Sequence, residues 1–289
     1  MNYIIFDLEW NQPADLSAAV TEPLLLTGEI IEIGAVKLDD DFKPVDELRL
    51  YITPKHYTRM HKRIAALTGI RDKDLMTRGI PFPEAFAQFR SWCGEEYRFM
   101  TWSMSDMPML IDNMLLHGID VSELPVCYDI QRIFGREIMR SDTRYALDTA
   151  LAILKLTGDT AHDALNDSRN TAKVCGQLDL EVYLEEYGAQ VFAEQPRPDI
   201  YRDHREALDD PRLAAFTCPW CGGEVQCEPW IRGDRCYMTC GVCPEEDEFL
   251  LQLSLSRQRT DAYRVRRLVY EMSDDLWDIY MDKKDPLPV

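Results

Sequence analysis

The stretch that decides the fold is YIIFDLEWNQ, residues 3–12. Its apolar and β-branched residues are typical of a buried strand, yet two acids, Asp7 and Glu9, interrupt it. Because side chains alternate along a strand, these two carboxylates point to the same face and lie side by side. Like charges held this close repel each other, so solvent, an arginine or a metal ion must compensate them.

Length and composition describe an ordinary globular protein: 289 residues, 46% hydrophobic and 29% charged, enough for one large domain and one smaller one. No apolar run reaches the ~20 residues that span a bilayer, and the first residues read as a strand rather than a signal peptide. We therefore expect a cytoplasmic protein with no membrane partner. The net charge of −19 argues against a broad surface that coats nucleic acid, but it allows an enzyme that holds a nucleic-acid end in a small metal-filled cleft.

The order of the predicted elements indicates the fold class. GEIIEIGAVKLDD (28–40) and ELRLYITP (47–54) predict a hairpin of two further strands, and YRFMTW (97–102) predicts a short one. A helix is expected at 106–118, and more helices follow it. Strands that form a meander first and then alternate with helices predict an α/β fold, a mixed sheet flanked by helices.

A change of composition divides the chain into domains. We place the first domain at residues 1–190 and a polar, proline-bearing linker at 191–215. A small cysteine-rich domain is expected at 216–289, and we predict that DAYRVRRLVYEMSDDLWDIYMD (261–282) closes it as a helix.

Three more polar residues are candidate partners of the acid pair. Asp106 begins a helix after a strand, and HDALNDSRNTA (162–172) offers His162 and Asp167 at a loop-to-helix junction. If they converge with the acid pair, four carboxylates share one sheet edge and suit two Mg²⁺ or Mn²⁺ ions, which prefer oxygen ligands. Two such ions about 3.5–4 Å apart can hold an attacking water and a leaving 3′ oxygen. His162 would be the general base, because imidazole titrates near neutral pH.

These motifs resemble those of a known family. FDLEWNQ, the Asp106 segment and HDALNDSRNTA together resemble the DEDDh exonucleases, which are named after four metal-binding acids and a histidine. The resemblance covers roughly residues 2–180 and implies an RNase H-like fold and removal of nucleotides from 3′ ends. MHKRIAALTGIRDKDL (60–75) is also similar to the family, and TWSMSDMPML (101–110) is similar to its Eri1-like group, which favours RNA. Trp102 stands where many proofreading relatives have asparagine, which argues against DNA proofreading.

We therefore predict a metal-dependent 3′→5′ exonuclease whose partner is nucleic acid, with RNA or short single strands favoured. The alternatives are a DNA exonuclease of proofreading or repair and a non-catalytic nucleic-acid-binding protein on the same fold. Trp10, Asn11 and Thr68 are candidate contacts to the terminal nucleotide, although structural roles suit them equally well.

Six of the nine cysteines lie within residues 218–243, and in a chain without export signals such a cluster favours metal binding over disulfides. CPWC and CGVC are C-x-x-C pairs with eighteen residues between them, a spacing that predicts a zinc ribbon with one structural Zn²⁺. The predicted ligands are Cys218, Cys221, Cys240 and Cys243. Cys227 and Cys236 could replace a ligand, pack as thiols or form a disulfide with each other.

The role of the predicted ribbon is left open, because such modules bind nucleic acid, bind a protein partner or cap a domain. Arginines that follow it either guide a phosphate backbone or form a solvated helix face. They are Arg257, Arg259, Arg264, Arg266 and Arg267.

Overall fold

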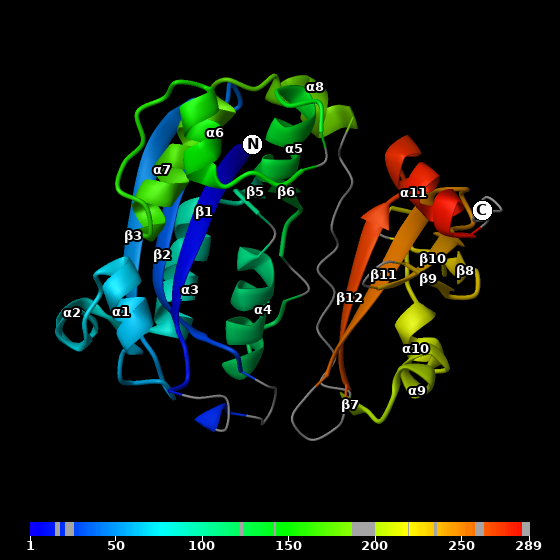
Figure 1. Ribbon diagram of the computed structural model, residues 1–289, viewed down its shortest axis with the longest axis horizontal. Helices are drawn as coiled ribbons and strands as arrows, with labels where there is room; N and C mark the ends of the chain where they lie inside the picture. The colour runs from blue at the N-terminus through cyan, green and yellow to red at the C-terminus, as the bar shows by residue number, and fades with distance from the viewer. Residues whose placement is uncertain are drawn as a thin grey trace. The chain divides into compact units, whose positions relative to one another are not determined.

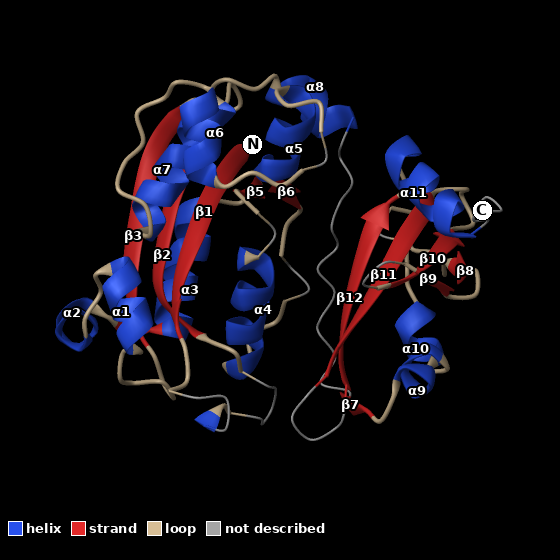
Figure 2. Cartoon of the chain, viewed as in Figure 1, coloured by secondary structure: helices blue, strands red, loops and turns tan. Residues whose placement is uncertain are grey.

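The computed structural model falls into two compact units, Met1–Glu185 and Glu186–Val289, each with a sheet of its own (Figures 1 and 2). Within the residues that it describes, no helix has both the length and the apolar composition that a membrane crossing requires. The described residues are 1–14, 18–20, 26–103, 105–121, 124–141, 143–186, 200–218, 220–233, 236–257 and 263–284.

The first unit is built on a six-stranded sheet of order β4-β3-β2-β1-β5-β6. Strands β1, β2 and β3 form an antiparallel meander, whereas β5 runs parallel to β1 and β6 runs parallel to β5. The mixed sheet and the hairpin predicted from the sequence are thereby confirmed. The strands are β1 (Asn2–Asn11), β2 (Glu29–Leu38), β3 (Pro44–Thr53), β4 (Ile80–Pro81), β5 (Tyr97–Thr101) and β6 (Cys127–Asp129).

The two faces of β1 meet different helices. On one face the ring of Phe6 packs edge-on against Phe89 of α3, with 5.9 Å between ring centroids. On the other face Ile5 shares a buried cluster with Leu165 of α7, so alternation places Asp7 on the α7 side. The helices are α1 (Lys62–Thr68), α2 (Asp72–Arg78), α3 (Phe82–Cys93), α4 (Asp106–Leu116), α5 (Ile130–Glu137), α6 (Leu147–Ile153), α7 (Ala164–Cys175) and α8 (Leu180–Glu186).

Helix α7 approaches the sheet closely because β2 has a glycine at the contact. A Cβ atom on Gly34 would lie only 2.0 Å from the backbone nitrogen of Leu165, so a larger residue would displace the helix. The hydroxyl of Ser168 donates to the carbonyl of Gly34 at 2.9 Å and holds the helix there. Gly34 is paired with Asp7 across the sheet, so the first turn of α7, which contains Asp167, is brought beside Asp7.

The second unit has an antiparallel sheet of order β7-β12-β11-β10-β8, with β9 also paired to β10. Phe249 and Leu251 of β11 and Val269 of β12 form part of its core. The elements are β7 (Ile200–Tyr201), α9 (His204–Leu208), α10 (Pro211–Ala214), β8 (Gln226–Cys227), β9 (Ile231–Arg232), β10 (Tyr237–Val242), β11 (Glu248–Arg257), β12 (Tyr263–Glu271) and α11 (Asp274–Lys284).

The predicted linker over 191–215 is wrong in its second half. Residues 191–199 lie outside the described residues, but β7, α9 and α10 belong to the second unit, where Leu213 is buried with residues of β11 and β12. The features that suggested a linker have local structural roles. Asp203 and Asp210 cap α9 and α10, and Pro211 occupies the first turn of α10, where its missing N–H costs nothing.

The predicted helix over 261–282 is also wrong in its first half. Residues Tyr263–Glu271 pair with β11 as strand β12, and the helix α11 begins only at Asp274. Val265 and Val269 are buried at strand spacing, and β-branched residues favour a strand once a neighbouring strand is present.

The arginines that the structure describes here lie on strands β11 and β12, so the helix face considered as one alternative is not formed by them. Arg267 donates to the carbonyls of Leu213 and Ala215, at 2.8 and 2.7 Å, and burial lowers its pKa to about 10. Arg257 has an interaction partner as well. Arg259 and the side chains of Arg264 and Arg266 lie outside what the structure describes.

Candidate active site

One cavity of about 340 Å³ in the first unit collects the side chains predicted to carry the chemistry. They come from β1, from the start of α4, and from the loop and first turn of α7. Glu9, His162 and Asp167 each offer one ligand atom, and these three atoms lie within 4.8 Å of one another. The five side chains are Asp7, Glu9, Asp106, His162 and Asp167.

Asp106 is held beside β1 by hydrogen bonds at two places on α4. Its carboxylate accepts the backbone N–H of Leu8 at 3.1 Å, so it does not act as a simple helix cap. Two turns further on, the buried side chain of Asn113 accepts the N–H of Ile30 at 3.1 Å and donates to the carbonyl of Gly28 at 3.2 Å. These contacts tie α4 to β1 and to the start of β2.

His162 is exposed and lies in a loop that α7 holds in place. Its φ angle of 62° is in the left-handed region, which is uncommon for a residue with a side chain. Its backbone N–H donates to Asp167 at 2.9 Å, and the buried Asn170 both accepts from and donates to the backbone of Asp159, at 2.7 and 3.1 Å. These contacts keep the imidazole at the cavity.

The acids of the cavity are more easily protonated than ordinary carboxyls. Burial, followed by repulsion from Glu32 and Asp167, raises the pKa of Glu9 to about 8. Burial also raises the pKa of Asp106 to about 7, and burial together with Asp106 raises the pKa of Asp7 well above its usual range. The charged forms of these acids are therefore disfavoured unless a cation compensates them.

Glu32 is a further acid that the sequence analysis did not single out. It is paired with Glu9 across β1 and β2 and is only 1% exposed. The Nε atom of Arg49 lies 3.2 Å from it, and the same guanidinium bonds Asp163, the residue that caps α7. Burial and Asp163 raise the pKa of Glu32 to about 7, while Arg49 opposes that rise. The available sequence signal is an acid inside the apolar part of β2, residues 30–36.

Few positively charged side chains lie near the acid pair. Arg49 forms ion pairs with Glu32 and Asp163. Among the residues that line the cavity, Arg63 is the only lysine or arginine. Four carboxylates with raised pKa values, open to one cavity, form an oxygen-rich set that fits divalent cations.

Of the three predicted substrate contacts, Trp10 lines the cavity and Asn11 does not. Asn11 is completely buried, and its amide group donates to the carbonyls of Tyr57 and Arg59, at 2.7 and 2.9 Å. Its oxygen accepts the N–H of His61 at 2.8 Å. Of the two roles considered for Asn11, these contacts favour the structural one, because both polar atoms of its side chain bind this neighbouring loop.

Thr68 likewise stabilises the end of α1 rather than lining the cavity. Its hydroxyl donates to the carbonyl of Ile64 at 3.0 Å and accepts the N–H of Ile70 at 3.1 Å. Arg63 and Leu67 line the cavity instead. They lie four residues apart and therefore share one face of α1. Helical periodicity in the sequence could have identified this pair.

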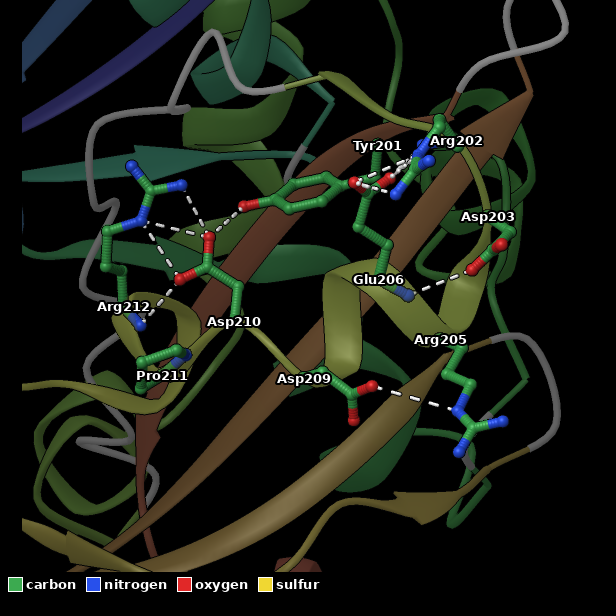
Figure 3. A pocket seen from close by; sticks show the side chains of 9 residues that line it. All are labelled: Tyr201, Arg202, Asp203, Arg205, Glu206, Asp209, Asp210, Pro211 and Arg212. Carbon is green, nitrogen blue, oxygen red and sulfur yellow. Dashed lines mark hydrogen bonds and ion pairs between the residues drawn. The ribbon is translucent and has the colours of Figure 1, made fainter.

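A second cavity lies in the second unit, lined by Tyr201 of β7 and by arginines and acids of α9, α10 and the loops next to them (Figure 3). The hydroxyl of Tyr201 donates to Asp210 at 2.7 Å, and each arginine there has an acid partner. The ion pairs are Arg202–Glu206, Arg205–Asp209 and Arg212–Asp210. Since its charges are neutralised locally, we assign this cavity no binding role.

All nine cysteines are free thiols, and three of them come together in the second unit. The sulfur atoms of Cys218, Cys221 and Cys243 lie within 4.8 Å of one another. Cys240, the fourth predicted zinc ligand, belongs instead to a separate buried cluster with residues of α11. Cys227 packs as a thiol, and its sulfur donates to the carbonyl of Ala214 at 3.3 Å.

The sequence pattern that defines the exonuclease family RNase_T matches residues 4–175, and the chain therefore belongs to this family. No curated protein sequence matches the chain. Its cavity gathers the four acids and the histidine that the sequence analysis singled out.

Solved structures share this fold at low sequence identity. The nuclease domain of 3′hExo, a DEDDh family member bound to rAMP, has a TM-score of 0.52 at 20% identity, over 61% of this chain and 90% of that one. Cell-death related nuclease 4 has a TM-score of 0.51 at 22% identity, over 61% and 62%. E. coli exonuclease I in complex with a dA16 oligonucleotide has a TM-score of 0.53 at 12% identity, over 99% and 71%.

Proposed function

We propose that the protein removes nucleotides from the 3′ ends of RNA or short single-stranded nucleic acid, in a hydrolysis that depends on divalent cations. The observation that carries this proposal is the convergence of four carboxylates and an imidazole around one cavity. Membership of the exonuclease family supports hydrolysis at chain ends.

Asp7, Glu9, Asp106 and Asp167 are the proposed ligands of two Mg²⁺ or Mn²⁺ ions. When bound, such ions polarise water and compensate the charge of the phosphate and of the leaving oxygen. The raised pKa values of Glu9 and Asp106 support this role, because they record repulsion and burial that bound cations would relieve. Ligand atoms of Glu9 and Asp167 lie within 4.8 Å of each other, and Asp7 and Asp106 line the same cavity, which supports a shared site for cations.

His162 is the proposed general base that takes the proton of the attacking water. A carboxylate that binds a cation is a poor base, whereas an imidazole titrates near neutral pH. The backbone bond from His162 to Asp167 holds the imidazole beside the acids. Its exposure lets the proton pass on to solvent.

Trp10, Arg63 and Leu67 are the proposed contacts to the substrate. The indole of Trp10 can stack on the terminal base, and the guanidinium of Arg63 can bind a phosphate. Leu67 is 46% exposed, which leaves an apolar surface for a base to cover. Stacking is tolerant of base identity, so we expect weak sequence preference.

The proposal also covers the preferred nucleic acid, the cellular compartment and a protein partner. The rAMP bound to the nuclease domain of 3′hExo supports RNA, and the dA16 bound to exonuclease I makes single-stranded DNA the second candidate. We place the protein in the cytoplasm, where clustered thiols stay reduced. The second unit is the proposed contact for a protein partner.

A time course on end-labelled substrates tests the proposal. RNA and DNA, single- and double-stranded, are labelled at the 3′ or the 5′ end and incubated with Mg²⁺ or Mn²⁺. We expect a 3′ label to leave as a mononucleotide at the first time points and a 5′ label to produce a descending ladder, fastest on single-stranded RNA. Release of the 5′ label first, or no cleavage of any substrate with either cation, would contradict the proposal.

A further inference from the structure

Three thiols in the second unit are gathered closely enough to bind one metal ion. The sulfur atoms of Cys218, Cys221 and Cys243 lie within 4.8 Å of one another. Thiolates around a tetrahedral zinc ion, with Zn–S bonds of about 2.3 Å, lie about 3.8 Å apart, so only a small contraction is needed. Cys218 and Cys243 are buried, at 1% and 4% exposure, beside the core residue Phe249.

The fourth cysteine of the C-x-x-C motifs lies elsewhere. Cys240 is inside strand β10 and paired with Leu250, whereas Cys243 follows the end of that strand. Because the chain stays extended as far as Val242, residues three apart face opposite sides of the sheet. Cys240 therefore packs under α11, in a cluster that includes Tyr280.

A carboxylate lies beside two of the three thiols in its place. The Oδ2 atom of Asp247 is 3.2 Å from the sulfur of Cys243 and 3.7 Å from the sulfur of Cys218. Asp247 is half-buried. Aspartate oxygen is an accepted ligand of zinc alongside thiolates.

The two segments that supply these side chains are both turns closed by backbone hydrogen bonds, over residues 218–223 in the first and 243–247 in the second. In the first, the N–H of Cys218 donates to the carbonyl of Gly223 at 2.8 Å, and the N–H of Gly223 donates to the sulfur of Cys221 at 3.4 Å. In the second, the N–H of Cys243 donates to the carbonyl of Asp247 at 2.9 Å, and the N–H of Asp247 donates to the sulfur of Cys243 at 3.3 Å. N–H groups aimed at sulfur stabilise the thiolate, which is the form that binds metal.

The two cysteine-bearing turns also share a feature of backbone conformation, and they pack against each other. Each turn has one residue in the left-handed region, Gly222 with φ 70° and Glu246 with φ 69°. In the sequence each turn also starts with a Cys-Pro pair. The turns pack together, because a Cβ atom on Gly223 would lie 2.7 Å from the ring of Pro244. Two facing turns of this kind form a metal-binding pair.

We propose that the second unit binds one Zn²⁺ through the thiolates of Cys218, Cys221 and Cys243 and the carboxylate of Asp247. Cys240 is a core residue and not a ligand. The ion joins the two turns at the edge of a small core, so its binding energy stabilises this unit. The proposed site lies in the second unit, whereas the acid cavity lies in the first.

Zinc content and affinity of the full-length chain test the ligand set. We expect the chain, purified under reducing conditions, to take up one equivalent of zinc at this site. Asp247→Ala should raise the Kd for Zn²⁺ at least about tenfold, as measured by competition with a chromogenic chelator. Cys240→Ala is the matched control and should leave the Kd unchanged, because it removes a thiol that faces the other side of β10.

Cobalt substitution reports the number of thiolate ligands directly. Sulfur-to-metal absorption arises only where thiolates bind the cobalt, so a cation in the acid cavity does not contribute to it. The wild-type chain and Cys240→Ala should absorb equally, and Asp247→Cys should absorb about one third more, as a fourth thiolate replaces the carboxylate. A wild-type chain that takes up no zinc overturns the proposal. Loss of zinc and of cobalt absorption in Cys240→Ala, with both kept in Asp247→Ala, overturns it in favour of a four-cysteine site.

Discussion

The acid cavity of the first unit and the thiol cluster of the second are assembled in opposite ways. The acids come from β1, α4 and α7, and the strand register and the close contact at Gly34 bring them together. The thiols come from two short turns, and hydrogen bonds within residues 218–223 and 243–247 shape each turn. One site depends on the whole fold, and the other depends mainly on local backbone conformation.

This difference changes what a metal ion does in each place. The sheet and its helices hold several acids together in the acid cavity. Burial and repulsion from neighbouring acids raise the pKa of Glu9 there. A cation there relieves repulsion and serves chemistry. The turns of the second unit surround a small core, so a cation there adds stability. Loss of metal should therefore stop hydrolysis in the first unit and loosen the fold in the second.

The largest effect should come from Asp7→Asn, which keeps the shape of the side chain and removes a charge from the acid set. We expect the hydrolysis rate to fall by about 10³-fold or more, because a cation ligand is weakened. The melting temperature should stay the same or rise, since Asp7 is repelled by Asp106. Near-wild-type turnover in a purified, folded variant would show that the acid set is not catalytic.

His162→Ala should lower kcat by about 10²- to 10⁴-fold, the usual contribution of a general base. Binding of Mn²⁺, followed by calorimetry, should persist because the four acids remain. His56→Ala is the matched control, as His56 is an exposed histidine of the same unit that does not line the cavity. Equal activities of the two variants would exclude His162 as the base.

Cation binding in the acid cavity should strengthen by at least about tenfold between pH 6 and pH 8, because protons compete for Glu9 and Asp106 over this range. The pKa of Glu9 rises from 4.5 in the unfolded chain to about 8 in the folded one. The folded protein thus binds the extra proton, and its stability without cations falls as pH rises across that window. Melting curves with and without Mn²⁺ should show a larger rise in Tm at pH 8 than at pH 6. An equal rise at both values would contradict the raised pKa.

The smallest effect should come from Asn170→Ala, which removes the two hydrogen bonds to Asp159 that hold the His162 loop. We expect kcat to fall about three- to tenfold with little change in KM, because the imidazole is less well placed while the substrate contacts on β1 and α1 are untouched. The cost in stability should be about 1–3 kcal/mol. A change in KM alone would assign Asn170 a different role.

The acid site could be predicted because its chemistry is visible in residue types and their order. A strand with two acids on one face is an anomaly, and a later acid and a His/Asp motif account for it. The contacts of Asn11 and Thr68 could not be predicted, because both types suit a substrate as well as a buried carbonyl. Only the packing of the loop before α1 and the end of α1 separates these roles.

The differences between sequence pattern and backbone in the second unit have a common cause. The C-x-x-C pattern at Cys240 assumes a turn, whereas pairing with β11 keeps that segment extended. The residues of β12 also fit a helical pattern, but pairing along the whole of β11 makes them a strand. Partners elsewhere in the chain override local preference in both places.

By itself the sequence determined the strand that bears Asp7 and Glu9, the hairpin that follows it and the presence of two polar clusters, because alternation and turn chemistry act over a few residues. The tertiary structure alone decided that Asn11 and Thr68 bind backbone carbonyls and that Asp247, not Cys240, lies beside the thiols. These choices depend on strand register and on helix-to-sheet distance, and both are set by contacts between residues far apart in the chain.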